Sequence, residues 1–176
     1  MIENIKKFPQ TITELERFID TYQNKLVHHA FYRLGCKEDS EDIVQNVIVK
    51  LYNKKERYVN IENPITYVFK SVSNACLDYM RANKSNYSKI NEDDVLLETS
   101  KDAHKAITEQ EEYERVNKIL ERIPDEQAEI LRLRIIDEMS FIEIAEVIGI
   151  PVTTAKSRFK YGIDKVKNIL EQIKSK

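Results

Sequence analysis

The chain has 176 residues, and its 28 Lys and Arg side chains nearly balance its 30 Asp and Glu side chains, giving a formal net charge of −2. This length accommodates one domain or two small ones, and a hydrophobic content of 41% is enough for a buried core. No run of about 18 uncharged apolar residues occurs, so no transmembrane helix is predicted. The segment MIENIKKFPQ lacks an apolar run and a cleavage site, so we expect no signal peptide and a cytoplasmic protein.

The pattern of apolar residues predicts an all-α fold. Only three Gly and four Pro occur, which disfavours a β fold with many tight turns, and apolar residues recur at three- and four-residue steps. A first helix is predicted from Thr13 to Leu34, with Gly35 ending it. A second is predicted to begin at Asp39 or Ser40 as N-cap, because acidic residues in the first turn suit the helix dipole.

A loop from Asn53 to Asn63 is predicted next, and Pro64 then begins a third helix that runs to about Asn83. Cys76 falls in its inward stripe and is expected to be a small core residue. Cys36 is far away in the sequence, and neither cysteine has a metal-binding spacing. Both are therefore expected to be reduced thiols.

Charge is unevenly distributed along the second half of the chain. Residues 85–114 hold nine acidic and three basic side chains, whereas residues 147–176 hold seven basic and two acidic ones. The polar segment 85–108 is predicted to be an acidic linker between helical domains at 10–84 and 109–174, although an ordinary solvated loop is the alternative. The basic C-terminal end points to a nucleic-acid contact there.

The C-terminal domain is predicted to contain four helices. The first spans about Glu109 to Arg122 and stops before Pro124. The second carries the apolar residues between Ala128 and Ile135. The third and fourth form the strongest local motif of the chain.

This motif has the pattern of a helix-turn-helix. Ser140 and Glu143 form a capping box, Gly149 ends the short helix, and Pro151 or Thr153 begins the last one. Lys and Arg on such a helix can meet guanine acceptors and phosphates in the major groove. The alternative is a helical hairpin whose basic side chains only face solvent. The residues expected at the exposed start of the last helix are Thr153, Thr154, Lys156, Ser157, Arg158 and Lys160.

The N-terminal domain carries two weaker signals. Four acids at the start of the second helix form a negative face that suits a basic protein surface. The third helix has an exposed face with Lys70, Asn74 and Arg81, near several aromatic residues, a mixture that can bind single-stranded DNA. The acids are Glu38, Asp39, Glu41 and Asp42, and the aromatic residues are Tyr52, Tyr58, Tyr67 and Phe69.

From about Tyr22 to Leu170 the chain resembles a bacterial sigma factor of the sigma-70 family, most closely the extracytoplasmic-function (ECF) group. That group keeps only sigma regions 2 and 4 joined by a linker, which fits this length. The segments that carry the resemblance are EDIVQ (Glu41–Gln45), the Tyr67–Arg81 helix with LDYMR, IPDEQAEILRLR (Ile123–Arg134) and SFIEIAEVIGIPVTTAKSR.

The resemblance implies a subunit that binds core RNA polymerase, recognises the −10 and −35 promoter elements and promotes transcription initiation. The clamp helices and flap tip of polymerase and promoter DNA are the implied partners, and an anti-sigma factor is a further partner that the family allows. The 53–63 loop would capture a flipped base. By resemblance, Glu41, Asp42, Gln45 and Asn46 bind polymerase, Tyr58, Lys70, Asn74 and Arg81 bind the −10 element, and Thr153, Thr154, Lys156, Ser157, Arg158 and Lys160 bind the −35 element.

Some positions depart from the family pattern. Asn46 stands where an acid is usual, Ile48 where Phe is common, and Ser73 where Arg is frequent. Tyr161-Gly162-Ile163 replaces a basic run after the recognition segment, and a glycine inside a helix costs about 1 kcal/mol.

No catalytic activity is predicted. His28 and His29 are adjacent on a helix and cannot share one face, so surface or packing roles are expected for them. We find no metal-ligand spacing, phosphate loop or nucleophile motif, so neither a cofactor nor a metal is predicted. Two other functions stay open at this point: a free-standing helix-turn-helix transcriptional regulator, and a helical adaptor that holds a protein partner through its acidic face.

Overall fold

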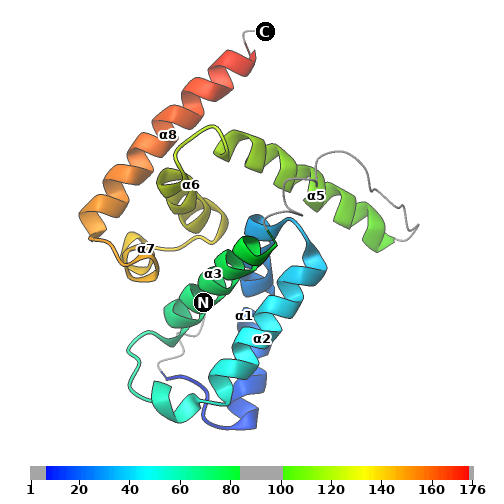
Figure 1. Cartoon of the computed structure of the whole chain (residues 1–176), viewed down its shortest axis with the longest axis vertical. Helices are drawn as coiled ribbons and strands as arrows, with labels where there is room; N and C mark the ends of the chain where they lie inside the picture. Colours follow the sequence, from blue (N-terminus) through cyan, green and yellow to red (C-terminus); the bar gives the residue numbers. More distant parts are fainter. Residues whose placement is uncertain (1–6, 84–100, 175–176) are drawn as a thin grey trace.

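The computed structural model describes residues 7–83 and 101–174, and every regular element in these two ranges is helical (Figure 1). This confirms the all-α prediction, with an N-terminal and a C-terminal helical domain. The N-terminal domain contains α1 (Ile12–Leu34), α2 (Lys37–Tyr52), the short 3-10 helix η1 (Lys55–Tyr58) and α3 (Pro64–Ala82). The C-terminal domain contains α5 (Lys101–Leu120), α6 (Asp125–Leu131), the π-helix η2 (Arg132–Ile136), α7 (Phe141–Ile148) and α8 (Val152–Lys174).

Local capping chemistry sets both ends of α1. The Thr11 hydroxyl accepts a hydrogen bond from the Glu14 backbone N–H, and the Glu14 carboxylate accepts one from the Thr11 N–H, which forms a capping box. Gly35 ends the helix with a φ of 69°, and its N–H donates to the carbonyl of Phe31. The predicted stop at Gly35 is confirmed.

The start of α2 differs from the prediction. Its N-cap is Cys36, which makes no side-chain capping bond, so the prediction of Asp39 or Ser40 as the cap is wrong. Glu38 and Asp39 already occupy the first turn, where the helix dipole favours acids. Ser40 is buried, and its hydroxyl donates to the carbonyl of Cys36 at 2.6 Å instead of capping the helix.

The C-terminal domain also departs from the predicted helix bounds. α5 begins at Lys101 instead of Glu109, and residues 85–100 of the predicted linker lie outside the described part of the chain. The helix expected around 128–135 is split into α6 and the π-helix η2. In η2 the N–H of Asp137 donates to the carbonyl of Arg132, a wider turn that apolar periodicity does not reveal.

The helix-turn-helix has the predicted capping. The Ser140 hydroxyl accepts from the Glu143 N–H, and the Glu143 carboxylate accepts from the Ser140 N–H, so the capping box is confirmed. Gly149 ends α7 with a φ of 79°, a left-handed conformation that glycine adopts without strain. α8 begins at Val152, between the two residues considered for its start.

Gly162 lies on the buried side of α8 and faces α6. A Cβ at this position would lie only 3.2 Å from Leu131 Cδ1 and 3.4 Å from Gln127 Cβ. Glycine therefore allows the two helices to approach closely, which offsets its unfavourable helix propensity.

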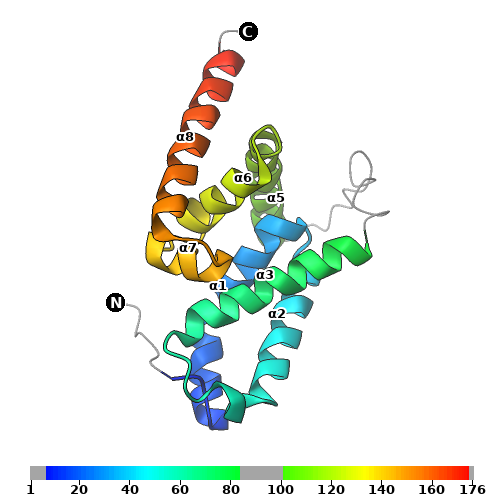
Figure 2. The ribbon, with the colours of Figure 1, turned by 60° about the vertical axis from the view of Figure 1, so that its left-hand side comes forward.

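The hydrophobic core continues from one domain into the other. Leu26, Val44 and Val72 are buried where α1, α2 and α3 pack together, and the same cluster includes Ile144 of α7. The first half of α3 lies beside α7 in both views (Figure 1, Figure 2). A smaller cluster around Leu131 joins α5, α6 and α8. The two domains are thus packed against each other along α3 and α7.

Cys76 is fully buried, as predicted for a small core residue, and burial raises the pKa of its thiol to about 11. Burial likewise raises the pKa of the Cys36 thiol to about 11, and both cysteines are free. Within the described ranges, no helix combines the length and apolarity needed to cross a bilayer, and no cluster of three His, Cys, Asp or Glu is arranged to hold a metal.

Candidate polymerase and promoter interfaces

The residues implied to bind polymerase share one exposed face of α2. Glu41, Asp42, Gln45 and Asn46 are all exposed, and residues three or four apart on a helix lie on the same side. Val49 follows Gln45 by one turn and is 52% exposed although it is apolar. Val49 was not among the residues predicted to bind polymerase. Its position one helical turn after Gln45 is the feature of the sequence that places it on the same face.

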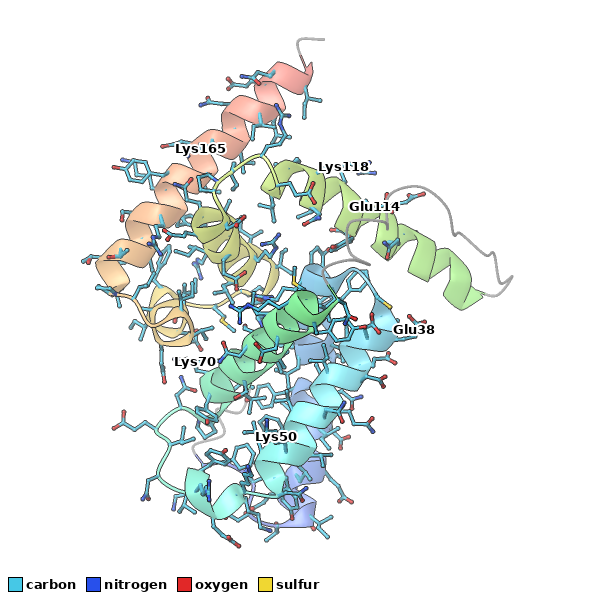
Figure 3. All side chains as sticks on the ribbon, viewed as in Figure 1. Glu38, Lys50, Lys70, Glu114, Lys118 and Lys165 are labelled. Atoms are coloured by element: carbon cyan, nitrogen blue, oxygen red, sulfur yellow. The ribbon has the colours of Figure 1, made fainter. Side chains whose placement is uncertain are left out.

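The four acids at the start of α2 do not all point outward. Glu38 is exposed and projects from the outer end of α2 (Figure 3), as do Glu41 and Asp42 farther along the helix. Asp39 is half-buried and hydrogen-bonds the Tyr79 hydroxyl of α3, which raises the pKa of Tyr79. The negative face therefore consists of the carboxylates of Glu38, Glu41 and Asp42.

Three of the residues implied to bind the −10 element lie along one side of α3. Lys70, Asn74 and Arg81 are separated by four and seven residues, a spacing that places them on one helical face. Asn74 is exposed and Lys70 half-buried, with Lys70 on the side of α3 opposite Glu38 in Figure 3. Arg81 is 74% exposed and pairs with Asp78 at 3.2 Å.

Tyr58, the fourth of these residues, is half-buried at the end of η1. Its ring centroid lies 5.7 Å from that of Phe8 and 5.2 Å from that of Tyr67 in α3. Burial and a hydrogen bond with Tyr58 raise the pKa of Tyr67. Tyr58 is thus fixed against the first turn of α3, and the tilted Tyr58–Tyr67 pair gives the 53–63 loop an aromatic surface.

The helix-turn-helix presents most of its implied −35 residues to solvent. α8 crosses α7 through small side chains, because Ala145 and Ala155 are both buried. Thr154 is half-buried, and the hydroxyl of Ser157 donates to its carbonyl at 3.0 Å. The exposed members of the set are Thr153, Lys156, Ser157 and Lys160.

Arg158 differs from these residues because its side chain turns toward α6. Its guanidinium lies 2.5 Å from the carboxylate of Glu126, and only 28% of the side chain is exposed. A DNA phosphate would have to share Arg158 with Glu126 or displace it. Glu126 was not identified from the sequence, because its partner lies far along the chain on another helix.

Phe159, the residue after Arg158, packs on Phe141 with ring centroids 5.4 Å apart, as a core residue does.

A buried polar cluster connects the two domains. His29 of α1 is fully buried, with its Nδ1 2.7 Å from Oδ2 of Asp137 and its Nε2 2.8 Å from the Ser73 hydroxyl of α3. Because a carboxylate only accepts hydrogen bonds, Nδ1 carries the proton and Nε2 accepts from Ser73. Burial and the nearby Arg33 charge lower the pKa of His29, and Asp137 opposes this effect only partly. His29 is therefore neutral near pH 7.

Arg33 completes this cluster one helical turn after His29. Its guanidinium lies 2.5 Å from Glu129 of α6 and 3.9 Å from Asp137, and it donates to the carbonyl of His29. Only 6% of the Arg33 side chain and 2% of Asp137 are exposed. Burial alone would raise the pKa of Glu129, but the charge and hydrogen bond of Arg33 lower it. The sequence predicts only a surface or packing role for His29 and does not reveal its partners.

An aromatic contact lies beside the polar cluster. Tyr113 of α5 packs on Phe31 and Tyr32 of α1, with ring centroids 5.4 and 6.2 Å apart. The same ring covers Gly35, where an added Cβ would lie only 2.7 Å from Tyr113 Cε1. The C-terminal end of α1 thus contacts the other domain through both charged and aromatic side chains.

Comparison with known proteins accounts for both domains. The family model for sigma-70 region 2 matches residues 18–86, which include most of α1 and all of α2 and α3. The model for sigma-70 region 4 matches residues 113–163, which include the helix-turn-helix. A free-standing helix-turn-helix regulator would not explain the match to region 2. A helical adaptor would not explain the match to region 4.

Relatives match over nearly the full chain. It is 25% identical to the ECF RNA polymerase sigma factor SigW of Bacillus subtilis (strain 168), over 98% of this chain and 96% of SigW. It is 26% identical to the RNA polymerase sigma factor SigV of the same strain, over 88% of this chain and 89% of SigV.

Two solved structures share the fold. CnrH in complex with the cytosolic domain of CnrY matches with a TM-score of 0.70 at 17% identity, over 92% of this chain and 90% of that chain. The sigma factor RpoE in complex with the anti-sigma factor NepR from Bartonella quintana matches with a TM-score of 0.66 at 17% identity, over 91% and 98%. The chain thus belongs to the ECF group of the sigma-70 family, a sigma factor with region 2 and region 4 domains that directs RNA polymerase to promoters and is not an enzyme.

Proposed function

We propose that this sigma factor docks on the clamp helices of core RNA polymerase through the exposed face of α2. The observation that carries this proposal is the continuous surface formed by Glu41, Asp42, Gln45 and Asn46, extended by the exposed apolar Val49. Carboxylates beside an apolar side chain suit a partner with basic groups around an apolar centre. The first helices of the C-terminal domain dock on the flap tip in the same complex.

The polymerase-bound protein reads the −10 element with the N-terminal domain. Lys70, Asn74 and Arg81 lie on one side of α3, where they can follow the backbone and bases of a single strand. The 53–63 loop captures a flipped base, with the Tyr58–Tyr67 pair as the neighbouring stacking surface.

The C-terminal domain reads the −35 element with the start of α8. Its exposed hydroxyl and basic side chains can contact base edges and phosphates in the major groove. Because the net charge of the chain is −2, the free protein binds DNA weakly, and polymerase supplies the additional attraction. The contacting residues are Thr153, Thr154, Lys156, Ser157, Arg158 and Lys160.

An anti-sigma factor is a further proposed partner. The structural neighbour RpoE is bound to the anti-sigma factor NepR, and CnrH is bound to the cytosolic domain of CnrY. Such a protein would block this sigma factor by covering the exposed α2 face.

In vitro transcription tests these roles separately. Purified core polymerase and this protein are incubated with genomic DNA of the source organism, and the 5′ ends of the transcripts are mapped. Asp42→Lys is expected to weaken binding to core polymerase at least tenfold, because it reverses a charge in the α2 face. Arg158→Glu is expected to leave core binding intact and abolish specific initiation.

Two matched controls make the test specific. Asp20→Lys makes the same charge reversal on an exposed site of α1, and Lys167→Glu reverses a charge nine residues after Arg158, on the opposite face of α8. Both should behave like the wild type. If Asp42→Lys binds core polymerase as tightly as Asp20→Lys does, the α2 face is not the docking surface.

A further inference from the structure

We propose that Leu77 of α3 packs against the face of an unpaired base of the −10 strand and thereby stabilises the melted promoter. This inference deepens the proposed function and rests on it, because it requires the −10 strand to follow α3. It adds an apolar base contact to a surface whose other members, Lys70, Asn74 and Arg81, are all polar or charged.

Leu77 lies in the middle of the α3 face proposed to contact the −10 strand. It follows Lys70 by seven residues and Asn74 by three, and it precedes Arg81 by four. These spacings place the four side chains on one side of the helix. With a rise of about 1.5 Å per residue, Leu77 is about 10 Å from Lys70 and about 6 Å from Arg81 along the helix axis. The apolar side chain therefore lies between two cations.

The Leu77 side chain is exposed, unlike the apolar residues on the inner side of α3. It is 46% exposed, whereas Val72 and Cys76 of the same helix are fully buried. Single exposed leucines are common on protein surfaces, so exposure by itself assigns no role. The distinguishing observation is that Lys70 and Arg81, which can each hold a phosphate, lie on both sides of this leucine.

The length of this face fits a short stretch of DNA strand. Lys70 and Arg81 are eleven residues apart, or about 16 Å along the helix axis. Successive nucleotides of a stacked strand are about 3.4 Å apart, so the interval holds about five nucleotide steps of a stacked strand and fewer of an extended one. At least one base passes Leu77 in either case.

The chemistry of the leucine selects the melted state of the DNA. Strand separation exposes base faces that were stacked in the duplex, and an apolar side chain packed on such a face recovers part of the lost stacking. Because paired bases are covered by their neighbours, this contact forms only after the strands separate. Leucine has no hydrogen-bonding group, so the contact favours opening without reading the base, whereas the neighbouring Asn74 can read a base edge.

Double-mutant cycles between Leu77 and the DNA test the contact directly. Holoenzyme is bound to a mapped promoter whose −10 region is opened in advance by mismatches, and an abasic site replaces each non-template base of the −10 element in turn. Leu77→Ala is expected to weaken binding to the intact pre-opened promoter about fivefold, as loss of a half-exposed leucine contact implies. At one position, the abasic site should cost the wild type a similar factor and cost Leu77→Ala almost nothing, because the contact is already lost.

Two further variants and a second template make the test specific. Leu170→Ala is the matched control, because Leu170 is 39% exposed on α8 and lies outside the α3 face. It should bind the pre-opened promoter like the wild type. Leu77→Met keeps an apolar side chain of similar volume and should bind within about twofold of the wild type. On the fully paired promoter at low temperature, where the strands stay together, Leu77→Ala should also match the wild type.

The outcomes separate this contact from the proposed function of α3. Additive losses at every −10 position, or equal losses of Leu77→Ala on the paired and pre-opened promoters, overturn the Leu77 contact. If Lys70→Ala and Arg81→Ala weaken binding to the pre-opened promoter in that case, the proposed function of α3 stands without Leu77. If neither of them weakens binding, α3 does not follow the −10 strand, and the Leu77 contact fails together with the proposed function.

Discussion

Ion pairs of this sigma factor occur in two contrasting regions. At the domain junction, Arg33 is 6% exposed and faces two carboxylates. Two further pairs involve arginines proposed to contact DNA: the Arg81–Asp78 pair has side chains 74% and 76% exposed, and the Arg158–Glu126 pair 28% and 68%. Buried pairs are costly to break, whereas exposed pairs exchange readily with solvent ions. Arginine–carboxylate pairs can therefore hold the two domains in one arrangement at the junction. At the surface, the same kind of pair leaves the arginine available to bind phosphate.

The largest effect is expected from removal of the buried cation. Arg33→Leu leaves Asp137 without its nearby cation and Glu129 without its partner, and loss of one partner from a buried pair costs about 3–5 kcal/mol. We expect the single urea-unfolding transition of the wild type to separate into two transitions, one for each domain, with the first at lower urea. Tyrosine fluorescence and far-UV circular dichroism measure this change.

The exposed counterpart provides the comparison. Arg81→Leu removes the same charge from a surface pair, which contributes at most about 1 kcal/mol. Its unfolding curve should overlay that of the wild type within this limit. Equal effects of the two substitutions would mean that burial does not distinguish the two regions.

The second largest effect concerns pH. Burial and Arg33 lower the pKa of His29, so below the ordinary value of 6.5 the unfolded chain binds a proton that the folded protein does not. The contribution of His29 to the free energy of unfolding should be complete above pH 6.5 and fall as the pH decreases from 6.5. The lowered pKa of Glu129 acts in the same direction at more acidic pH, where its carboxylate takes up a proton. Urea midpoints between pH 7.5 and 5.5 measure this dependence.

Several charged groups contribute to this pH dependence. His29 faces Arg33 on its own helix, Ser73 and Phe69 on α3, and Asp137 after η2, with Glu129 of α6 also acting on it. His29→Gln removes the titrating group and should flatten the dependence between pH 7.5 and 5.5. His28→Gln removes the neighbouring exposed histidine and should leave the dependence unchanged. A steep dependence retained in His29→Gln would assign it to other groups.

Capping motifs and helical periodicity in the sequence predicted the features that depend only on residues close together in the chain. The capping box of Ser140 and Glu143, and the left-handed stops at Gly35 and Gly149, need only residues a few positions apart. The acids at the start of α2 were likewise predicted to form a negative face, and Glu38, Glu41 and Asp42 are exposed. These features are set within one helix, so periodicity and capping rules suffice.

The missed features depend on residues distant in sequence. His29 and Asp137 are 108 positions apart, and no pattern within α1 reveals that the apolar stripe there ends in a polar contact with another domain. Gly162 is explained only by the position of Leu131 on α6. The π-helix before Asp137 likewise has no periodic signal in the sequence. These features depend on how the helices of the two domains pack together. Patterns among neighbouring residues of a single sequence do not reveal this packing.

The smallest effect is expected where an exposed acid competes with DNA. Glu126→Gln removes the carboxylate 2.5 Å from Arg158, and an exposed pair of this kind contributes at most about 1 kcal/mol, which corresponds to at most about a fivefold change in affinity. Because phosphate no longer has to displace a carboxylate, we expect the polymerase holoenzyme to bind a mapped promoter two- to fivefold more tightly. Protein stability should be unchanged within the same limit.

Promoter affinity measured at several salt concentrations distinguishes competition from positioning. Under competition, Arg158 gains a phosphate contact in Glu126→Gln, and the affinity falls more steeply with salt than in the wild type. If Glu126 instead holds Arg158 in the orientation that DNA requires, the same variant binds more weakly, and the exposed pair acts as a fixed structural element like the pairs at the junction. Glu121→Gln, which removes an exposed carboxylate just after α5, controls for the change in net charge. Weaker promoter binding by Glu126→Gln would therefore contradict the proposed difference between the buried ion pairs at the junction and the exposed ion pairs at the surface.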